Sequence, residues 1–256
     1  MSVMNDDRPA EPPAVSMSRR LLAEGLGTGL LVAVVVGSGI AAQRLSPDDV
    51  GLQLLENSLT TALGLTVLIL LLGPVSGAHF NPVVSAADWF LGRRSRAGLP
   101  GRVVGLYVVA QVLGGVLGAL LANAMFGVAP AISTTARVSS GTLLGEVVAT
   151  AVLVMLIFGL AATGRGGLAA PAVGAYIGAA YWFTSSTSFA NPAVTIARLF
   201  SDTFAGIAPG SVAPYVIAQL VGAVIGIALT GLLFPAASRA ADRVVVPHPA
   251  AGEAAI

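Results

Sequence analysis

Two stretches of this sequence, SGAHFNPV at residues 76–83 and STSFANPA at residues 186–193, decide the fold. Each is followed by an apolar run, to Leu91 in the first case and to Phe200 in the second, that is too short to cross a bilayer. Asparagine is a favoured helix N-cap and proline a favoured first helical residue, so each Asn-Pro pair is expected to begin a short helix. Irregular backbone at membrane depth is tolerated only where protein buries it or a watery cavity lies beside it. The two stretches therefore predict re-entrant half-helices along a pathway through a membrane protein.

The composition supports membrane insertion. Hydrophobic residues make up 55% of the 256 positions and charged residues 10%, well below the roughly 25% charged residues of soluble domains. Six stretches are long and apolar enough to span, at about 20–43, 54–74, 102–126, 140–163, 167–187 and 211–235. The net charge of +1 and the absence of cysteine give no indication of nucleic-acid binding, disulfides or thiol chemistry, and no metal-binding motif is present.

The sequence also repeats itself. Ala23-Glu24-Gly25 in the first span matches Gly145-Glu146-Val147 in the fourth, and residues 107–111 (YVVAQ) match residues 215–219 (YVIAQ). A glycine pair at four-residue spacing follows each glutamine, which lets helices approach closely in lipid. Those pairs are Gly114 with Gly118, and Gly222 with Gly226.

Three spans in each half place the two copies in opposite orientations, because an odd number of crossings ends on the other side of the membrane. Inverted repeats about an axis in the membrane plane place a binding or transport pathway at their interface. We expect repeat one at about 18–126, repeat two at about 139–236, one channel domain over 18–236, and flexible cytoplasmic tails at 1–17 and 237–256.

The arginines predict the orientation. All 13 basic residues are arginine, and basic residues accumulate on the cytoplasmic side of membrane proteins. On the predicted topology ten lie on the side of the termini and three on the other, so both termini are expected in the cytoplasm, with the protein in the inner membrane. The ten are Arg8, Arg19, Arg20, Arg93, Arg94, Arg96, Arg102, Arg165, Arg239 and Arg243, and the three are Arg44, Arg137 and Arg198.

The half-helices indicate which solutes could pass. If both begin near the midplane, their positive dipole ends, each equivalent to roughly half a charge, face one another and oppose cations and protons. The amides of Asn81 and Asn191 can donate to a passing oxygen, so neutral hydroxylated solutes are favoured.

These paired motifs, the repeated glutamates and the six spans resemble the aquaporin or major intrinsic protein family over about residues 18–236. The resemblance implies an all-α membrane protein of aquaporin-like fold, with six transmembrane helices and two re-entrant half-helices in two inverted repeats. It also implies homotetramers with a pore in each subunit, no cofactor and no catalysis. The pore motifs would be Asn81, Pro82 and Val83 in the first loop and Asn191, Pro192 and Ala193 in the second.

The resemblance assigns Glu24 and Glu146 a scaffolding role, in which each carboxylate accepts hydrogen bonds from one re-entrant loop. A proton relay is the alternative, since a carboxylate inside a span is usually functional. His79 would border the cytoplasmic vestibule or serve as a structural histidine. Pro74 stands where many relatives have another histidine, which argues against a pH gate built on that residue.

The narrow filter of the family lies outward of the Asn-Pro motifs. By alignment on residues 64–67 and by counting back from Asn191, its four positions would be Leu63, Ala179, Ser188 and Val194. Val194 replaces the family's filter arginine, and Thr195 replaces the aspartate of typical glycerol facilitators. Small or aliphatic residues at three positions predict a wide and apolar filter.

Residues 191–198 (NPAVTIAR) resemble a bacterial subgroup associated with arsenic resistance, which makes arsenous acid a candidate solute. Arg198, one turn after Val194, would either line the outer vestibule or pair with Asp202 or lipid at the rim. Two other classes of protein fit parts of the pattern. A secondary transporter also has inverted repeats and broken helices, and a non-conducting structural role is the third reading.

Overall fold

The computed structural model describes residues 15–93, 95–235 and 237, and this part of the chain is helical without strands. Its first half contains four α-helices and its second half contains four more, with a short 3-10 helix beside two of the last four. The elements are α1 (Met17–Leu45), α2 (Val50–Ser76), α3 (Pro82–Gly92), α4 (Gly101–Met125), α5 (Ser140–Ala162), η1 (Gly166–Leu168), α6 (Ala169–Phe183), α7 (Pro192–Ala197), η2 (Arg198–Phe200) and α8 (Pro209–Leu233).

Five of these helices, α1, α2, α4, α5 and α8, are long and apolar enough to cross a membrane, with 23 to 29 residues each. The predicted span at 167–187 is the exception, because α6 has only 15 residues. The chain leaves the helix at Thr184, which has extended backbone angles, and enters the second re-entrant loop. At 1.5 Å per α-helical residue and 2.0 Å per 3-10 residue, η1 and α6 together rise about 28 Å, so the sixth crossing needs both.

Small residues bring the long helices together in equivalent pairs, α1 with α4 and α5 with α8. A Cβ atom built on Gly114 or Gly118 would lie 2.0 Å from the carbonyl oxygen of Gly25 or Gly29. In the second half, a Cβ on Gly222 would lie 2.5 Å from the carbonyl oxygen of Val147. Backbones at this distance leave no room for a side chain, so the predicted close approach at these glycines is confirmed.

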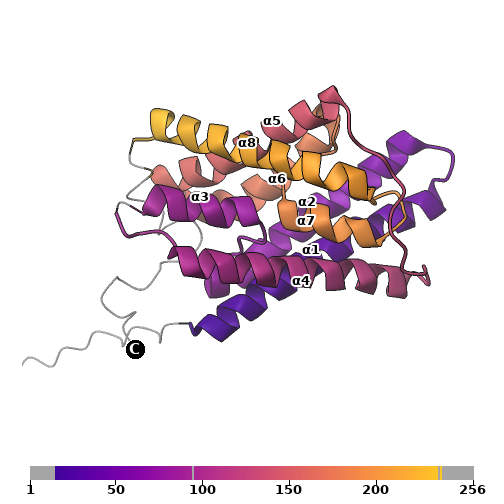
Figure 1. Ribbon diagram of the computed structural model, residues 1–256, viewed down its shortest axis with the longest axis horizontal. Coiled ribbons are helices and arrows are strands. Elements are labelled where there is room, and N and C mark those ends of the chain that lie inside the picture. Colours follow the sequence, from indigo (N-terminus) through magenta and orange to yellow (C-terminus); the bar gives the residue numbers. More distant parts are fainter. Residues whose placement is uncertain (1–14, 94, 236, 238–256) are drawn as a thin grey trace, which may run out of the picture.

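The two half-helices α3 and α7 lie in one line between α4 and α8 (Figure 1). Asn81 is the N-cap of α3 and Asn191 the N-cap of α7, and a proline follows in each case. α3 ends at Gly92, close to the predicted Leu91. α7 ends already at Ala197, and η2 continues it to the predicted Phe200.

Long apolar side chains cover the outside of the helical bundle, as expected where lipid is the solvent. Exposed members include Leu63, Val67, Leu70, Leu113, Leu117, Val224 and Leu232. The predicted tails fall outside the described residues except for residues 15–17 and 237, and so do Arg8, Arg94, Arg239 and Arg243.

Candidate solute pathway

The N-caps of the two half-helices are joined to one another at the centre of the molecule. The amide nitrogen of Asn81 donates to the carbonyl oxygen of Ala190 over 2.8 Å, and that of Asn191 donates to the carbonyl oxygen of Phe80 over 2.7 Å. Each amide oxygen accepts a backbone N–H of its own helix, from Val83 and from Ala193. Each asparagine thus caps one half-helix and fixes the loop of the other. Since an amide nitrogen carries two N–H groups, one on each asparagine is not needed for these bonds.

Two buried carboxylates hold the loops. Glu24 accepts from the backbone N–H groups of His79 (3.0 Å) and Phe80 (2.8 Å), and from Ser76 Oγ (2.6 Å) and Gln111 Nε2 (2.7 Å). Its counterpart in the second half has the corresponding partners.

Glu146 accepts from the backbone N–H groups of Phe189 (2.9 Å) and Ala190 (2.8 Å) and from Gln219 Nε2 (2.6 Å). Both carboxylates are fully buried, and neither belongs to the residues that line the cavity described below. The repeated glutamine of each half therefore donates a hydrogen bond to the glutamate of the same half.

The two loops share an unusual backbone. Positive φ angles occur at the same three places before each asparagine, at Gly77 (92°), Ala78 (48°) and Phe80 (49°) in the first loop and at Thr187 (61°), Ser188 (49°) and Ala190 (46°) in the second. Such angles are costly for residues other than glycine. The carboxylate bonds to the N–H groups next to these positions help to keep both loops in this conformation.

A cavity runs between the half-helices and the helices α1, α2, α5 and α6. Its wall contains both loops, residues 77–81 and 188–191, and side chains spaced four apart along the helices, so that each helix contributes one face. These are Leu31 and Val35 from α1; Thr61, Leu65 and Ile69 from α2; Leu153 and Ile157 from α5; and Ala169, Val173, Ile177 and Tyr181 from α6. The wall is largely apolar, with polar groups at the two loops and at Thr61, Tyr181 and Arg198.

Two of the four predicted filter residues are wrong. Leu63 is 61% exposed on the outside of α2, and Ala179 is exposed on the outside of α6; neither lines the cavity. The residues two positions to either side do face it. They are Thr61 and Leu65 of α2, and Ile177 and Tyr181 of α6. Each helical residue turns the side chain by about 100°, so an alignment shifted by two positions selects nearly the opposite face.

Thr61 and Tyr181 form a pair that sequence reasoning missed. Their hydroxyl oxygens lie 3.2 Å apart across the α2–α6 contact, and both side chains are buried. The four-residue spacing of Thr61 from Leu65 and of Tyr181 from Ile177 is the signal that could have identified them.

The other two predicted filter residues, Ser188 and Val194, do line the cavity. Val194 is 5% exposed and faces the space from α7. Ser188 is 4% exposed, and its Oγ has no hydrogen-bond partner among the described residues. A buried hydroxyl of this kind is costly unless something that enters the cavity satisfies it.

His79 and Arg198 also line the cavity, His79 from the first loop and Arg198 from η2. His79 Nδ1 lies 3.0 Å from Ser85 Oγ, and its ring packs edge-on against Tyr107. Arg198 is 3% exposed, and its Nε donates to the carbonyl oxygen of Ala205. Asp202 instead accepts from the backbone N–H of Thr134. The reading of Arg198 as a rim residue paired with Asp202 or lipid is therefore wrong.

Comparisons with known proteins agree on one family. The family model described as "Major intrinsic protein" matches residues 12–189 and 169–255. The chain is 49% identical to Aquaglyceroporin AqpS of Rhizobium meliloti (strain 1021) over 83% of this chain and 89% of that protein. It is 30% identical to Probable aquaporin AqpM of Archaeoglobus fulgidus over 82% of this chain and 94% of that protein.

A solved structure has the same fold. The X-ray structure of the aquaglyceroporin from Plasmodium falciparum superposes with a TM-score of 0.65, covering 89% of this chain and all of that chain at 20% identity.

Proposed function

The chain belongs to the major intrinsic protein family, and from this premise we infer that it is a passive membrane channel for small neutral solutes, with a filter that admits polyols and metalloid hydroxides besides water. Members of this family are channels, not enzymes. The relatives named above are aquaporins and aquaglyceroporins, so the secondary-transporter alternative has no support among them.

The observation that carries the broader solute range is the residue at the filter position after Asn191-Pro192-Ala193. Val194 faces the cavity there, where the family resemblance implies an arginine. A valine leaves more room than an arginine and presents methyl groups instead of five N–H donors. Pore width and lining hydrogen-bond groups decide which neutral solute passes.

The polar groups of the same region give such a solute its hydrogen bonds. We assign the filter to Thr61, Tyr181, Ser188 and Val194, in which three hydroxyl groups lie beside one aliphatic side chain. A polyol or an arsenous acid molecule carries hydroxyl groups that can both donate and accept. The unpartnered Ser188 Oγ and the second N–H groups of Asn81 and Asn191 are suitable partners.

The buried glutamates act as scaffold, not as proton relay, in this proposal. Support comes from their backbone partners and from their position outside the cavity wall. His79, at the opposite end of the pathway from Arg198, borders the inner vestibule.

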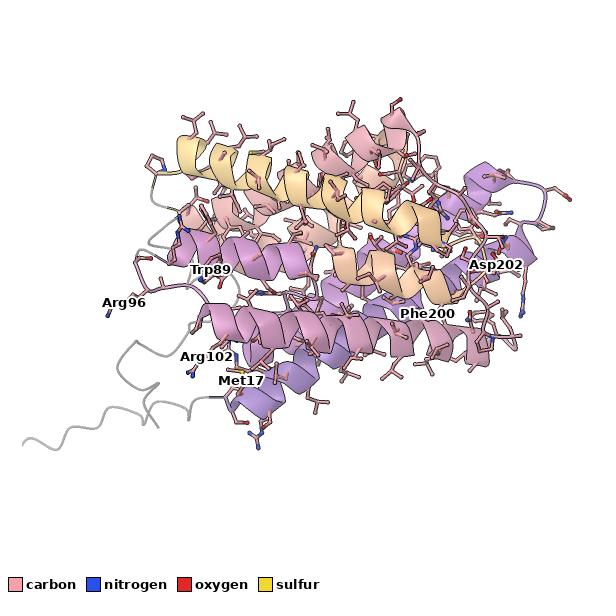
Figure 2. All side chains as sticks on the ribbon, viewed as in Figure 1. Met17, Trp89, Arg96, Arg102, Phe200 and Asp202 are labelled. Carbon is pink, nitrogen blue, oxygen red and sulfur yellow. The ribbon has the colours of Figure 1, made fainter. Side chains whose placement is uncertain are left out.

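The channel works as a homotetramer in the inner membrane with both termini in the cytoplasm. Figure 2 supports this orientation, because Arg96 and Arg102 lie at the same end of the molecule as Met17, and Asp202 lies at the other end. Basic residues gathered at the end that carries the N-terminal helix favour a cytoplasmic position for that end. Native mass spectrometry in detergent tests the tetramer.

Stopped-flow measurement on proteoliposomes tests the function. Water, glycerol, urea and arsenous acid should all equilibrate faster than in protein-free liposomes, without saturation and without response to an ion gradient. Passage of water alone would contradict the wide filter. Uphill uptake on a proton gradient would support a transporter, and the absence of any flux would support a structural role.

A further inference from the structure

The filter region as assigned carries no charge, yet one arginine lies one helical turn farther along the same face. Val194 and Arg198 are four residues apart, which places both on one face of the α7–η2 segment, and both line the cavity. At 1.5 Å per residue, Arg198 starts about 6 Å beyond Val194. η2 lies at the end of the molecule where Figure 2 labels Phe200 and Asp202, the outer end in the orientation given above.

The guanidinium of Arg198 is fixed in place. Its Nε donates to the carbonyl oxygen of Ala205, and its Cζ lies 3.5 Å from the centroid of the Phe189 ring. Phe189 is held in turn, since its backbone N–H is bound by Glu146 and its ring packs against Tyr215. The carbonyl group and the negative face of the ring stabilise the cation without neutralising it.

This charge has no carboxylate partner in the described part of the chain. The acid nearest in sequence is Asp202, and its carboxylate accepts hydrogen bonds from the backbone N–H and the hydroxyl of Thr134. A second positive charge lies on the same ring, because Cζ of Arg137 is 5.4 Å from the centroid of Phe189. Arg137 donates hydrogen bonds to the backbone carbonyl oxygens of Gly206 and Phe204, and it does not line the cavity.

Burying an unpaired guanidinium in the wall of a pathway costs folding free energy. A charge kept at this cost indicates a functional role. We propose that Arg198 is the specificity-determining cation of this channel: from one turn outside the filter it repels cations and protons and donates hydrogen bonds to the oxygen atoms of neutral solutes. The inference rests on the channel function proposed above. It separates two tasks, since Val194 leaves the filter wide while the positive charge is supplied beyond it.

The sharpest probe is a pair of solutes of one shape, urea and the guanidinium ion. Both are planar and similar in size, but only guanidinium is charged. In proteoliposomes the wild-type protein should pass urea and exclude guanidinium. Arg198→Met should admit guanidinium and protons at least about tenfold faster, because a unit charge in a weakly screened site dominates the barrier for an ion. Proton entry is followed with an enclosed pH dye.

Three further proteins make the result specific. Arg198→Lys keeps the charge and should retain exclusion of guanidinium. Arg198→Gln keeps a donor for the Ala205 carbonyl and should leak like the methionine variant, which covers the case in which that variant fails to fold. Arg44→Met removes an exposed arginine that binds the Phe126 carbonyl away from the cavity and should behave as wild type.

The outcomes distinguish the two proposals. A wild-type protein that passes no neutral solute overturns the channel function. A wild-type protein that passes urea and guanidinium at similar rates overturns only the role of Arg198. The same conclusion follows if a neutral variant at position 198, folded and with wild-type urea flux, shows no increase in guanidinium or proton leak.

Discussion

At the scale of single residues, the second re-entrant loop contains a strained backbone, because a threonine occupies the left-handed region. Thr187 has a φ of 61°, and its counterpart in the first loop, at the same distance before the asparagine, is Gly77 with a φ of 92°. A β-branched residue is a strong outlier there. The first loop avoids this strain and the second does not, although the same carboxylate arrangement holds both.

Replacement of Thr187 by glycine should therefore stabilise the protein. Relief of about 1–3 kcal/mol of backbone strain exceeds the roughly 0.4–1 kcal/mol that glycine adds to the entropy of the unfolded chain, which leaves a gain of about 1 kcal/mol. Thermal unfolding in detergent should show a higher midpoint. The matched control, Gly77→Ala, should be destabilising, since its Cβ would lie 3.2 Å from the His79 ring at a positive φ. A lower midpoint for Thr187→Gly would show that the threonine side chain contributes more than the strain it causes.

The two buried glutamates give a second prediction at this scale. In Glu24→Gln or Glu146→Gln, an amide NH2 group would face backbone N–H donors that a carboxylate now satisfies. Leaving one buried donor without a partner costs about 1–3 kcal/mol, so each variant should unfold at lower temperature and conduct less. Neither should alter the response of solute flux to a proton gradient. Glu56→Gln is the control, because Glu56 accepts from Ser46 alone within the described part of the chain and should tolerate the change.

If the wild-type flux instead depends on a proton gradient, and the glutamine variants lose that dependence while remaining folded, the scaffold role is incorrect.

At the scale of helices, the structure depends on backbones that touch. Gly114 and Gly118 of α4 pack directly against the backbone of Gly25 and Gly29 of α1, with no side chain between them. Because lipid tails are as apolar as leucine, such packing replaces the hydrophobic effect as the force that joins helices in a membrane.

Gly114→Ala should separate α1 from α4. The new methyl group would lie 2.0 Å from the Gly25 carbonyl oxygen, and backbone cannot yield as a flexible side chain can, so we expect a loss of at least about 1–3 kcal/mol. Gly105→Ala in the same helix has no atom within 4 Å of its new Cβ and should be neutral or slightly stabilising. Thermal scans of both proteins test this, and equal midpoints would mean that the helices can move apart without cost.

The helices also show what the sequence could predict and what it could not. The half-helices were predictable because Asn-Pro at 81 and 191 is a local capping signal, which can be recognised from neighbouring residues alone. The cavity-lining residues on α2 and α6 were not, because the face that a residue presents depends on rotation about the helix axis, and a misalignment of two residues replaces Thr61 by Leu63 and Tyr181 by Ala179. The early end of α6 at Phe183 is likewise set by the loop that it must join to Asn191.

At the scale of the whole molecule, the two inverted halves meet at one point and differ beyond it. The centre is symmetric, with asparagine, glutamate and glutamine repeated in equivalent contacts. The two ends of the cavity are not, because His79 lines it from the first loop while Arg198 enters it beyond the second. In the function proposed above, the symmetric half-helix dipoles contribute one part of the barrier to ions, and the end of the cavity that contains Arg198 adds a second part and selects among neutral solutes.

Selectivity is the property of the whole channel that depends most directly on this asymmetry, and Val194→Arg should change it. The new side chain would enter the cavity between Ser188, Tyr181 and Arg198, where it reduces the width and replaces an aliphatic wall with five N–H donors. Glycerol and arsenous acid flux should fall at least about tenfold, the change that roughly 1.4 kcal/mol of added barrier produces. Water, which is smaller and can accept from the guanidinium, should be slowed less, so the permeability ratio of water to glycerol rises.

The guanidinium that Val194→Arg adds to that of Arg198 distinguishes this variant from one that only narrows the cavity. Val194→Met adds length without charge and should lower glycerol flux without reducing proton leak, whereas Val194→Arg should lower both, since two guanidiniums one turn apart repel a cation more strongly than Arg198 alone. Far-UV helicity and oligomer recovery must match the wild-type protein before the fluxes are compared. Glycerol flux that is equal or greater in a correctly folded Val194→Arg protein would place the width-limiting position elsewhere along the cavity, and the hydroxyl pair of Thr61 and Tyr181 would then be the next position to substitute.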